Sequence, residues 1–262
     1  MRVLVKLGGT LLDAPATRTA LAGQIAAARA RGTEVVVVHG GGRQMTQYLA
    51  ERGIESRFAG GLRITTPETL DAVLMVLAGS VNHELVACLN RAGALAVGLS
   101  GIDALLVEAE QMDPALGAVG RVTKVNPALL ELLASKGYVP VVACVAGDRQ
   151  ARVYNVNADQ MAAACAAAFS ARQLIFLTDV AGVLGPGSSL RTVLTAAESE
   201  QLIAAGIATG GMQAKLGAAL AALRGGVEQV RIAPGAAERV LERILAGEQI
   251  GTRLAPDEVR AA

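Results

Sequence analysis

Two lysines and one aspartate occupy positions that are unusual for surface charges. Lys6 ends an apolar run and precedes a glycine pair, Asp159 lies in the first turn of a predicted helix, and Lys215 is the one charge in the stretch 210–223. A lysine at the end of a buried strand is costly to desolvate, so Lys6 is expected to face an anion or a carboxylate. Two ammonium groups and a carboxylate, with no evident general base, suit phosphoryl transfer to a carboxylate, because an ionised carboxylate attacks without losing a proton.

Each of these residues also has an ordinary structural explanation. Lysines are mostly solvated or ion-paired, so Lys6 and Lys215 could both be surface groups. Lys215 is expected beside the apolar stripe of its helix rather than on it. Asp159 could only complement the helix dipole, since Asn157 is placed to cap that helix. Asn155 lies just outside the helix, and its amide is expected to be free for a polar group of a ligand.

Glycine turns at predicted strand ends supply a site for an anion. The stretch EVVVVHGGGRQM, residues 34–45, runs from a β-branched strand through Gly40, Gly41 and Gly42 into a helix. Backbone amides without a neighbouring Cβ can approach a ligand closely, and the start of a helix adds positive partial charge. The alternative is that the glycines only make a tight turn. The stretches KLGG, GLSG and LTDVAGVLG repeat the arrangement at other strand ends.

Several common sites are excluded by the sequence. It has no GxxxxGK[ST], GxGxxG or GxSxG motif, and its histidines are His39 and His83. A net charge of +1 and 2% aromatic residues argue against a nucleic-acid partner. Cys88, Cys144 and Cys165 lie in separate apolar segments, which predicts buried thiols rather than disulfides or a zinc site. No metal site built from side chains is predicted.

The composition favours a globular cytoplasmic protein. Hydrophobic residues make up 52% of the chain and the mean hydropathy is +0.43, with much of this from alanine. No apolar stretch is expected to reach the roughly 18 to 20 residues that span a bilayer. The start, MRVLVKLGG, reads as a strand and lacks the pattern of a signal peptide. We therefore expect no membrane partner.

Apolar runs that alternate with helical patterns must position these residues. Strands are predicted at 2–7, 34–39, 94–100, 138–145, 173–180 and 228–233. Helices are predicted at about 17–31, 43–52, 67–92, 127–136, 158–169, 198–205, 210–224 and 235–246. Shorter strands within 104–125 and 148–157 are expected at the sheet margin. The pattern predicts an α/β fold with a mostly parallel sheet between helical layers, and any division falls near residue 171.

Eight motifs occur along the chain between Lys6 and about Leu254: KLGGTLL, VVHGGGRQM, GGLRIT, GLSGID, GYVPVVA, NVNADQ, LTDVAGVL and GGMQAKL. In order and spacing they resemble the motifs of the amino acid kinase family. The resemblance implies an αβα sandwich with an open, mainly parallel sheet. It implies that an N-lobe, 1–170, binds an acyl-amino acid and dimerises, and that a C-lobe, 171–262, binds ATP, with Mg²⁺ held mainly by the nucleotide phosphates. The resemblance is strongest to members that phosphorylate the side-chain carboxylate of N-acetyl-L-glutamate in arginine biosynthesis.

The resemblance also implies roles for individual residues. Lys6 and Lys215 match the transition-state lysines, and Asp159 matches the aspartate that organises them. The positions that match substrate contacts are Gly41, Gly42, Arg63 and Asn155. The positions that match nucleotide contacts are Gly8, Gly9, Asp179, Val180, Ala181, Gly182, Val183, Leu184, Ile207, Ala208 and Thr209. The helix 67–92 matches a dimer interface, which predicts a homodimer.

Two alternatives stay open. Ile102 in GLSGID stands where a polar residue is common, and the stretch from Gln111 to Leu133 also resembles members that act on carrier-protein-bound aminoadipate or glutamate, or on a differently acylated glutamate. A non-catalytic nucleotide or amino-acid sensor on the same fold would not need Lys6, Asp159 and Lys215 together. The amino-terminal extension of arginine-inhibited, hexameric relatives is missing, so an arginine-insensitive dimer is expected.

Overall fold

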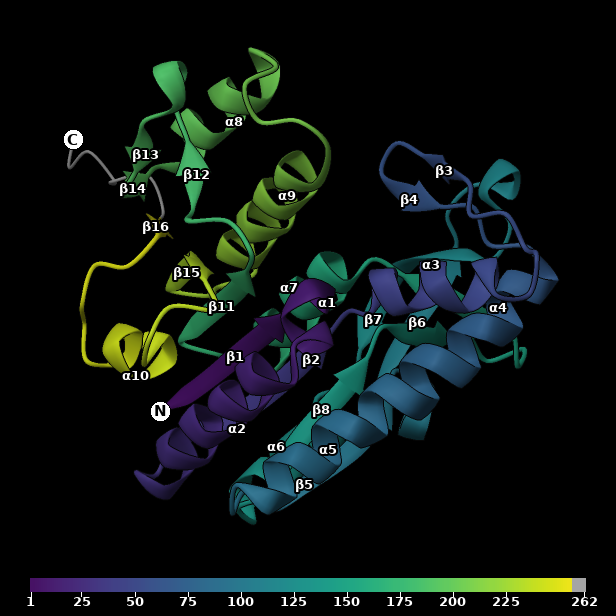
Figure 1. The fold of residues 1–262 in the computed structure, drawn as a ribbon, viewed down its shortest axis with the longest axis horizontal. Helices are drawn as coiled ribbons and strands as arrows, with labels where there is room; N and C mark the ends of the chain where they lie inside the picture. Colours follow the sequence, from purple (N-terminus) through teal and green to yellow (C-terminus); the bar gives the residue numbers. More distant parts are fainter. Residues whose placement is uncertain (256–262) are drawn as a thin grey trace.

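The computed structural model describes residues 1–255 and is built on one large sheet (Figure 1). The strand order is β14-β16-β15-β11-β1-β2-β8-β5. The bounds are β1 (Arg2–Leu7), β2 (Glu34–His39), β5 (Ala96–Ser100), β8 (Val139–Ala143), β11 (Gln173–Thr178), β14 (Val193–Leu194), β15 (Gln229–Pro234) and β16 (Thr252–Leu254). All neighbours run parallel except β15 and β16. The predicted α/β class with a mainly parallel sheet is confirmed.

The central strands are rich in Val, Leu and Ile and are buried on both faces. Val3, Leu4 and Val5 of β1 are fully buried, as is typical of a parallel sheet covered by helices on both sides. Leu7 at the end of β1 pairs with His39 of β2 on one side and with Leu177 of β11 on the other. The turns that follow these three strands therefore meet at one edge of the sheet, where open α/β sheets bind ligands.

Helices cover both faces of this sheet (Figure 1). The bounds are α1 (Gly9–Asp13), α2 (Pro15–Ala30), α3 (Gly42–Ala50), α4 (Pro67–Val73), η1 (Leu74–Val81), α5 (Asn82–Arg91), α6 (Ala128–Ser135), α7 (Ala158–Ala168), α8 (Ala196–Ala204), α9 (Gly210–Arg224) and α10 (Val240–Leu245), with short 3₁₀ turns at Asp103–Leu105, Pro114–Leu116 and Pro186–Ser188. One layer contains α2 packed against α5 and α10, and the other contains α7 packed against α9. This arrangement follows from right-handed crossovers that progress along the sheet in opposite directions.

A second, closed unit of four strands lies beside the main sheet. It contains β6 (Val107–Gln111), β7 (Val119–Val125), β9 (Val145–Gly147) and β10 (Val153–Val156). The strands predicted within 104–125 are present as β6 and β7, which pair antiparallel, but they belong to this closed unit and not to the margin of the main sheet. The single strand predicted at 138–145 is divided into β8 and β9. The chain leaves the main sheet at Cys144, and β9 pairs with β10. An unbroken apolar run gives no signal that a chain changes sheets.

Two small hairpins and the start of α10 also differ from the predictions. The pairs β3 (Phe58–Ala59) with β4 (Leu62–Arg63) and β12 (Val183–Leu184) with β13 (Leu190–Arg191) are too short to show a period. The predicted helix 235–246 begins only at Val240, because Arg239 has a left-handed φ of 51°.

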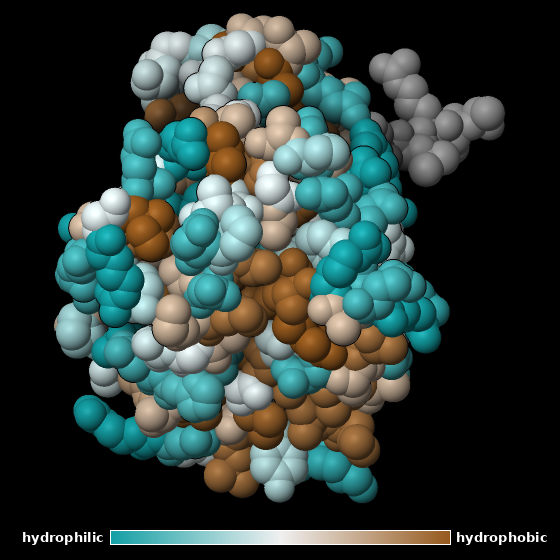
Figure 2. All heavy atoms as spheres, turned by 90° about the vertical axis from the view of Figure 1, so that its right-hand side faces the viewer, coloured by the Kyte–Doolittle hydropathy of each residue, from teal (hydrophilic) through white to brown (hydrophobic). Residues whose placement is uncertain are grey.

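The predicted helix 67–92 is present as α4, η1 and α5 in succession, and η1 is a π-helix. By length and composition the helix Pro67–Arg91 could cross a membrane, so the expectation that no apolar segment of that length occurs is wrong. Core helices of globular proteins pass the same test, and Leu77, Leu85 and Leu89 of this helix lie in the hydrophobic core. Buried residues make up 44% of its most apolar window. Figure 2 shows a broad hydrophobic patch on the side of the molecule that carries this helix.

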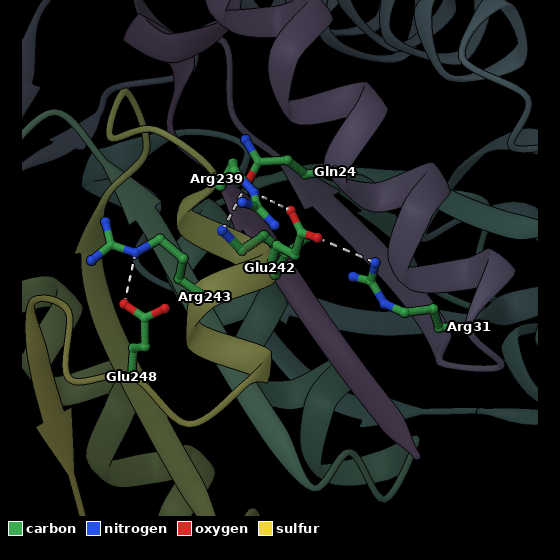
Figure 3. Close-up of polar contacts among 7 residues, drawn as sticks. Gln24, Arg31, Arg239, Glu242, Arg243 and Glu248 are labelled. Atoms are coloured by element: carbon green, nitrogen blue, oxygen red, sulfur yellow. Dashed lines mark hydrogen bonds and ion pairs between the residues drawn. The ribbon is translucent and has the colours of Figure 1, made fainter.

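A polar network joins α10 to α2 near the amino end of β1 (Figure 3). Gln24 Oε1 of α2 accepts a hydrogen bond of 2.8 Å from the Leu241 N–H of α10. Glu242 forms ion pairs with Arg31 at 3.4 Å and Arg239 at 2.8 Å. These contacts attach the last part of the described chain to the first helical layer, at the end of β1 opposite the glycine turns.

Candidate active site

The structure brings Lys6, Asp159 and Lys215 into one buried cluster. Lys6 Nζ lies 2.8 Å from Asp159 Oδ1, and Lys215 Nζ donates to Asp159 Oδ2 at 2.9 Å. Their side chains are 9% to 10% exposed, although they come from β1, α7 and α9. The explanation of Lys6 and Lys215 as solvated surface groups therefore does not hold.

Local sequence places the two helical members of this cluster. Asn157 Oδ1 accepts hydrogen bonds from the N–H groups of Asp159 and Gln160, at 2.9 and 3.2 Å, and so caps α7 as predicted. The cap fixes Asp159 in the first turn. Lys215 lies in the second turn of α9, and its ammonium group is 5.6 Å from the ring centroid of Phe176 on β11.

The electrostatics of the cluster favour an added anion. Burial raises the pKa of Asp159, but Lys6 and Lys215 outweigh it and hold this pKa below its ordinary value. Burial and the nearby charge of Lys6 lower the pKa of Lys215, while Asp159 opposes this effect. Two ammonium groups and one carboxylate leave a net charge of 2 − 1 = +1 in a desolvated site. A buried excess of positive charge is stabilised by an incoming anion.

The lowered pKa of Asp159 predicts a pH-dependent contribution to stability. The contribution is complete above the ordinary carboxyl pKa of about 3.9 and is lost as pH falls through the lower folded-state value. Asp159→Asn should be less stable than the wild type at neutral pH by about 3 to 5 kcal/mol, because it leaves buried ammonium groups unpaired. Urea unfolding of both proteins from about pH 7 to about pH 3 should show this difference shrinking below about pH 4. A difference that stays constant over this range would contradict the assignment.

Two glycine turns face each other next to this cluster. A Cβ on Gly9 would lie 3.1 Å from Gly42 N and 3.2 Å from Gly41 N, so the turns approach more closely than side chains would allow. A Cβ on Gly41 would lie 2.5 Å from Leu77 Cδ2. Gly8 N donates to Leu177 O at 2.9 Å and Gly40 N to Leu7 O at 3.1 Å, which anchors both turns to strand ends. Such a cradle of amides fits the phosphates of a nucleotide.

The predicted substrate residues line one cavity of 160 Å³. Its polar wall contains Gly41, Gly42, Arg63 and Asn155. Apolar side chains complete the wall, among them Met45, Leu77, Val119, Cys144 and Val156. The cavity is smaller than the sites of drug-sized ligands, which indicates a small molecule.

Arg63 is held rigidly in that wall. Its guanidinium donates to Gly42 O at 2.9 Å, Thr46 Oγ1 at 2.8 Å and Ser56 Oγ at 2.5 Å. It also stacks on Phe58, 4.6 Å from the ring centroid. Burial lowers the pKa of Arg63, which is still a strong base. These contacts hold a cation in the wall of the cavity.

Asn155 is held by one side-chain hydrogen bond, which leaves its second N–H and its Oδ1 for a ligand. Its Nδ2 donates to Thr65 Oγ1 at 3.1 Å, and Thr65 Oγ1 in turn donates to Arg63 O at 2.8 Å. The hydroxyls of Thr46, Ser56 and Thr65 were not recognised from the sequence. Thr46 follows Gly42 by four residues on α3, which is the one signal that could have identified it.

The predicted nucleotide-binding positions fall into three groups. Gly182, Val183 and Ala208 are buried, so they can offer a ligand only backbone atoms. The Val183 N–H is already bonded to Thr252 Oγ1 at 2.8 Å. Gly8 and Gly9 are half-buried in the turn after β1. The remaining positions are exposed after β11 and around the start of α9: Asp179, Val180, Ala181, Leu184, Ile207 and Thr209.

The cysteines and other possible metal ligands are placed as follows. Cys144 and Cys165 are buried, and burial raises their pKa to about 11 and about 12, whereas Cys88 is half-buried. In residues 1–255, no group of three or more His, Cys, Asp or Glu side chains is placed to hold a metal ion.

The structure combines a mainly parallel sheet with a buried lysine–aspartate–lysine cluster and two facing glycine turns. The chain belongs to the amino acid kinase family, whose model matches residues 1–234. It is 74% identical over 254 residues to the acetylglutamate kinase of Solibacter usitatus (strain Ellin6076), a match that covers 97% of this chain and 99% of that protein.

Two further proteins extend the comparison. The acetylglutamate kinase of Rhizobium leguminosarum bv. trifolii (strain WSM2304) is 43% identical over 268 residues, which covers 97% of this chain and 91% of that protein. The structure of N-acetylglutamate synthase from Neisseria gonorrhoeae, complexed with coenzyme A and N-acetyl-glutamate, superimposes with a TM-score of 0.87 at 26% identity. That match covers 98% of this chain and 59% of the synthase chain.

Proposed function

We propose that this protein transfers the γ-phosphoryl group of ATP to the side-chain carboxylate of N-acetyl-L-glutamate, a step of arginine biosynthesis. The observation that carries the proposal is the buried cluster of Lys6, Asp159 and Lys215 beside the facing glycine turns. Its support from comparison is 74% identity to an acetylglutamate kinase over nearly the whole chain.

The chemistry needs positioning and positive charge rather than a base. A carboxylate oxygen attacks the γ-phosphorus, the bond from that phosphorus to the β,γ-bridging oxygen breaks, and ADP leaves with the bond's electron pair. The product is an acyl phosphate, and no proton is transferred. Lys6 and Lys215 stabilise the charge that is shared between the attacking and leaving oxygens. Asp159 keeps both ammonium groups within reach of that charge.

The cavity beside the glycine turns would hold the acceptor. Arg63 is the buried cation of its wall and would bind the carboxylate that does not react. Asn155 would bind the amide of the acyl group. Gly41 and Gly42 would bring backbone atoms close to the reacting carboxylate, and the apolar wall would enclose the acetyl group.

The nucleotide would bind between the Gly8–Gly9 turn and the loops after β11 and before α9. In this proposal an N-lobe, 1–170, binds the acceptor, and a C-lobe, 171–262, binds ATP, with residues 256–262 outside the described chain. In this proposal the nucleotide phosphates would carry most of the Mg²⁺ coordination. Mg²⁺ would supply further neutralisation of the transferred charge. The reaction would take place in the cytoplasm.

The proposed assembly is a homodimer through the helix 67–92. The exposed side of this helix supports the proposal, since the helix is strongly apolar but only partly buried in one chain. Met75 on η1 is 52% exposed. A second copy would cover this surface.

Trapping the acyl phosphate with hydroxylamine tests the proposed reaction. With ATP and Mg²⁺, N-acetyl-L-glutamate should give a hydroxamate, whereas free glutamate should give little. Lys136→Ala, which alters an exposed lysine directly after α6, should leave the yield unchanged.

The same assay separates the alternatives. Hydroxamate only from aminoadipate or glutamate attached to a carrier protein, or only from a differently acylated glutamate, would move the function to those substrates. Binding of ATP or of N-acetyl-L-glutamate without hydroxamate from any acceptor would identify a sensor and would overturn the proposal.

A further inference from the structure

His39 lies at the end of β2 and has no exposed surface. Its Nδ1 lies 2.9 Å from the carbonyl oxygen of Gly40, the first glycine of the triplet. Its Nε2 lies 3.0 Å from Nδ2 of Asn82, which is also buried. Neither residue lines the substrate cavity, so neither can contact the acceptor directly. Both lie directly behind the glycine turn.

The neighbours of this pair define where each proton lies. Asn82 Nδ2 also contacts the carbonyl oxygens of Val141, at 2.9 Å, and Leu99, at 3.5 Å. The short contact to Val141 O requires the amide nitrogen at that position, so Nδ2 is a donor. Its two hydrogens are donated to Val141 O and to Nε2 of His39, at 2.9 and 3.0 Å, while Leu99 O at 3.5 Å is a longer contact. The remaining ring proton is then on Nδ1 and is donated to Gly40 O. Burial lowers the pKa of His39 to about 4, which keeps the ring neutral and in this tautomer at neutral pH.

This hydrogen bond fixes the peptide between Gly40 and Gly41. Within residues 1–255 all peptide bonds are trans, so the Gly40 C=O and the Gly41 N–H point in opposite directions. The hydrogen bond from His39 keeps the Gly40 carbonyl oxygen directed toward the imidazole ring. The Gly41 N–H therefore points away from the ring. Gly41 N lies beside the Gly8–Gly9 turn, and in the described chain its N–H donates to no protein acceptor.

The π-helix η1 packs against Gly41, and the helix that continues it carries Asn82. Leu77 and Val81 of η1 pack where a Cβ on Gly41 would lie, and Asn82 follows directly as the first residue of α5. Gly98 on β5 leaves room for Asn82, because a Cβ there would lie 2.2 Å from Asn82 Oδ1. π-helical segments occur frequently at functional sites. One helix therefore supports both the backbone of Gly41 and the ring of His39.

We infer that His39 and Asn82 are positioning residues, which orient the Gly41 N–H as a donor to the transferred phosphoryl group. The inference rests on the proposed phosphoryl transfer, which already includes the amides of the glycine turns, and adds the two side chains that fix one of these amides. Backbone donors of this kind accelerate a reaction only if they are fixed before the charge develops. His39 acts through Gly40 and does not touch the reacting atoms.

Three substitutions and one spectrum test the inference. His39→Leu removes the Nδ1–H donor at similar size, His39→Asn keeps an N–H donor on the atom that replaces Nδ1, and Asn82→Leu removes the donor to Nε2. We expect His39→Leu to lower kcat by about 10- to 100-fold, less than the loss of a direct oxyanion donor. The KM values should stay within about 3-fold, and His39→Asn should stay within about 3-fold of the wild type. The ¹⁵N spectrum of the wild-type imidazole should show a protonated Nδ1 and an unprotonated Nε2.

Each result has a defined consequence. Unchanged kcat in His39→Leu, or equal losses in His39→Leu and His39→Asn, would overturn the inference, and so would a loss confined to KM. If His39→Leu does not fold, Asn82→Leu replaces it and should lower kcat while His39→Asn does not. A wild-type protein that forms no hydroxamate would refute the proposed function instead, whereas a protonated Nε2 in an active wild type would refute only the role of His39.

Discussion

Lys215→Met is expected to lower kcat by about 100- to 1,000-fold, the loss typical for removing one preorganised group that stabilises transition-state charge. Methionine has a similar length and keeps the packing against Phe176, but it carries no charge. The KM values for ATP and the acceptor should change by less than about 3-fold, because the ammonium group acts on charge that forms during the transfer. Steady-state kinetics with both substrates measures the effect.

The fold of this variant should be intact, since Asp159 keeps its ion pair with Lys6. Lys136→Ala is the matched control, because it removes an exposed lysine outside the site and should keep wild-type kinetics. A variant of Lys215 with unchanged kcat and a raised KM would show that the ammonium group only binds the ground state.

Gly9→Ala is expected to reduce kcat/KM by about 100-fold or more. The added methyl group would lie 3.1 Å from Gly42 N and 3.2 Å from Gly41 N, and would fill the space in which these amides would meet a phosphate. Backbone strain is not the cause, since Gly9 is the first residue of helix α1 and alanine is favourable in helices. The hydroxamate assay with purified protein measures the loss.

Gly23→Ala is the control for this substitution. Gly23 lies inside α2, and nothing lies within 4 Å of its added Cβ. The control should keep full activity and gain up to about 1 kcal/mol in the free energy of unfolding. Full activity of Gly9→Ala would contradict the assignment of the two glycine turns to phosphate binding.

The sheet was predictable from sequence because its strands follow from composition. The run 34–39 contains four consecutive valines, a pattern typical of a strand that is buried on both faces. The closed four-stranded unit was not predictable, because its strand β9 continues the apolar run of β8 after one residue, Cys144. Periodicity describes a strand and does not show which sheet it joins.

The site was predictable only in part. Lys6 and Asp159 could be assigned to a strand end and a first turn, but the burial of Lys215 depends on how α9 packs against α7. His39 and Asn82 are 43 residues apart, and their contact depends on the register of a π-helix that no sequence pattern indicated. Tertiary packing, rather than local preference, fixes such contacts.

A crystal structure with Mg-ADP, N-acetyl-L-glutamate and an aluminium fluoride mimic of the phosphoryl group is the most direct test of the central claim. The account predicts that Lys6 Nζ and Lys215 Nζ both lie within hydrogen-bond distance of the mimic, while Asp159 still contacts both. A mimic bound with either ammonium group out of reach would contradict the proposed mechanism.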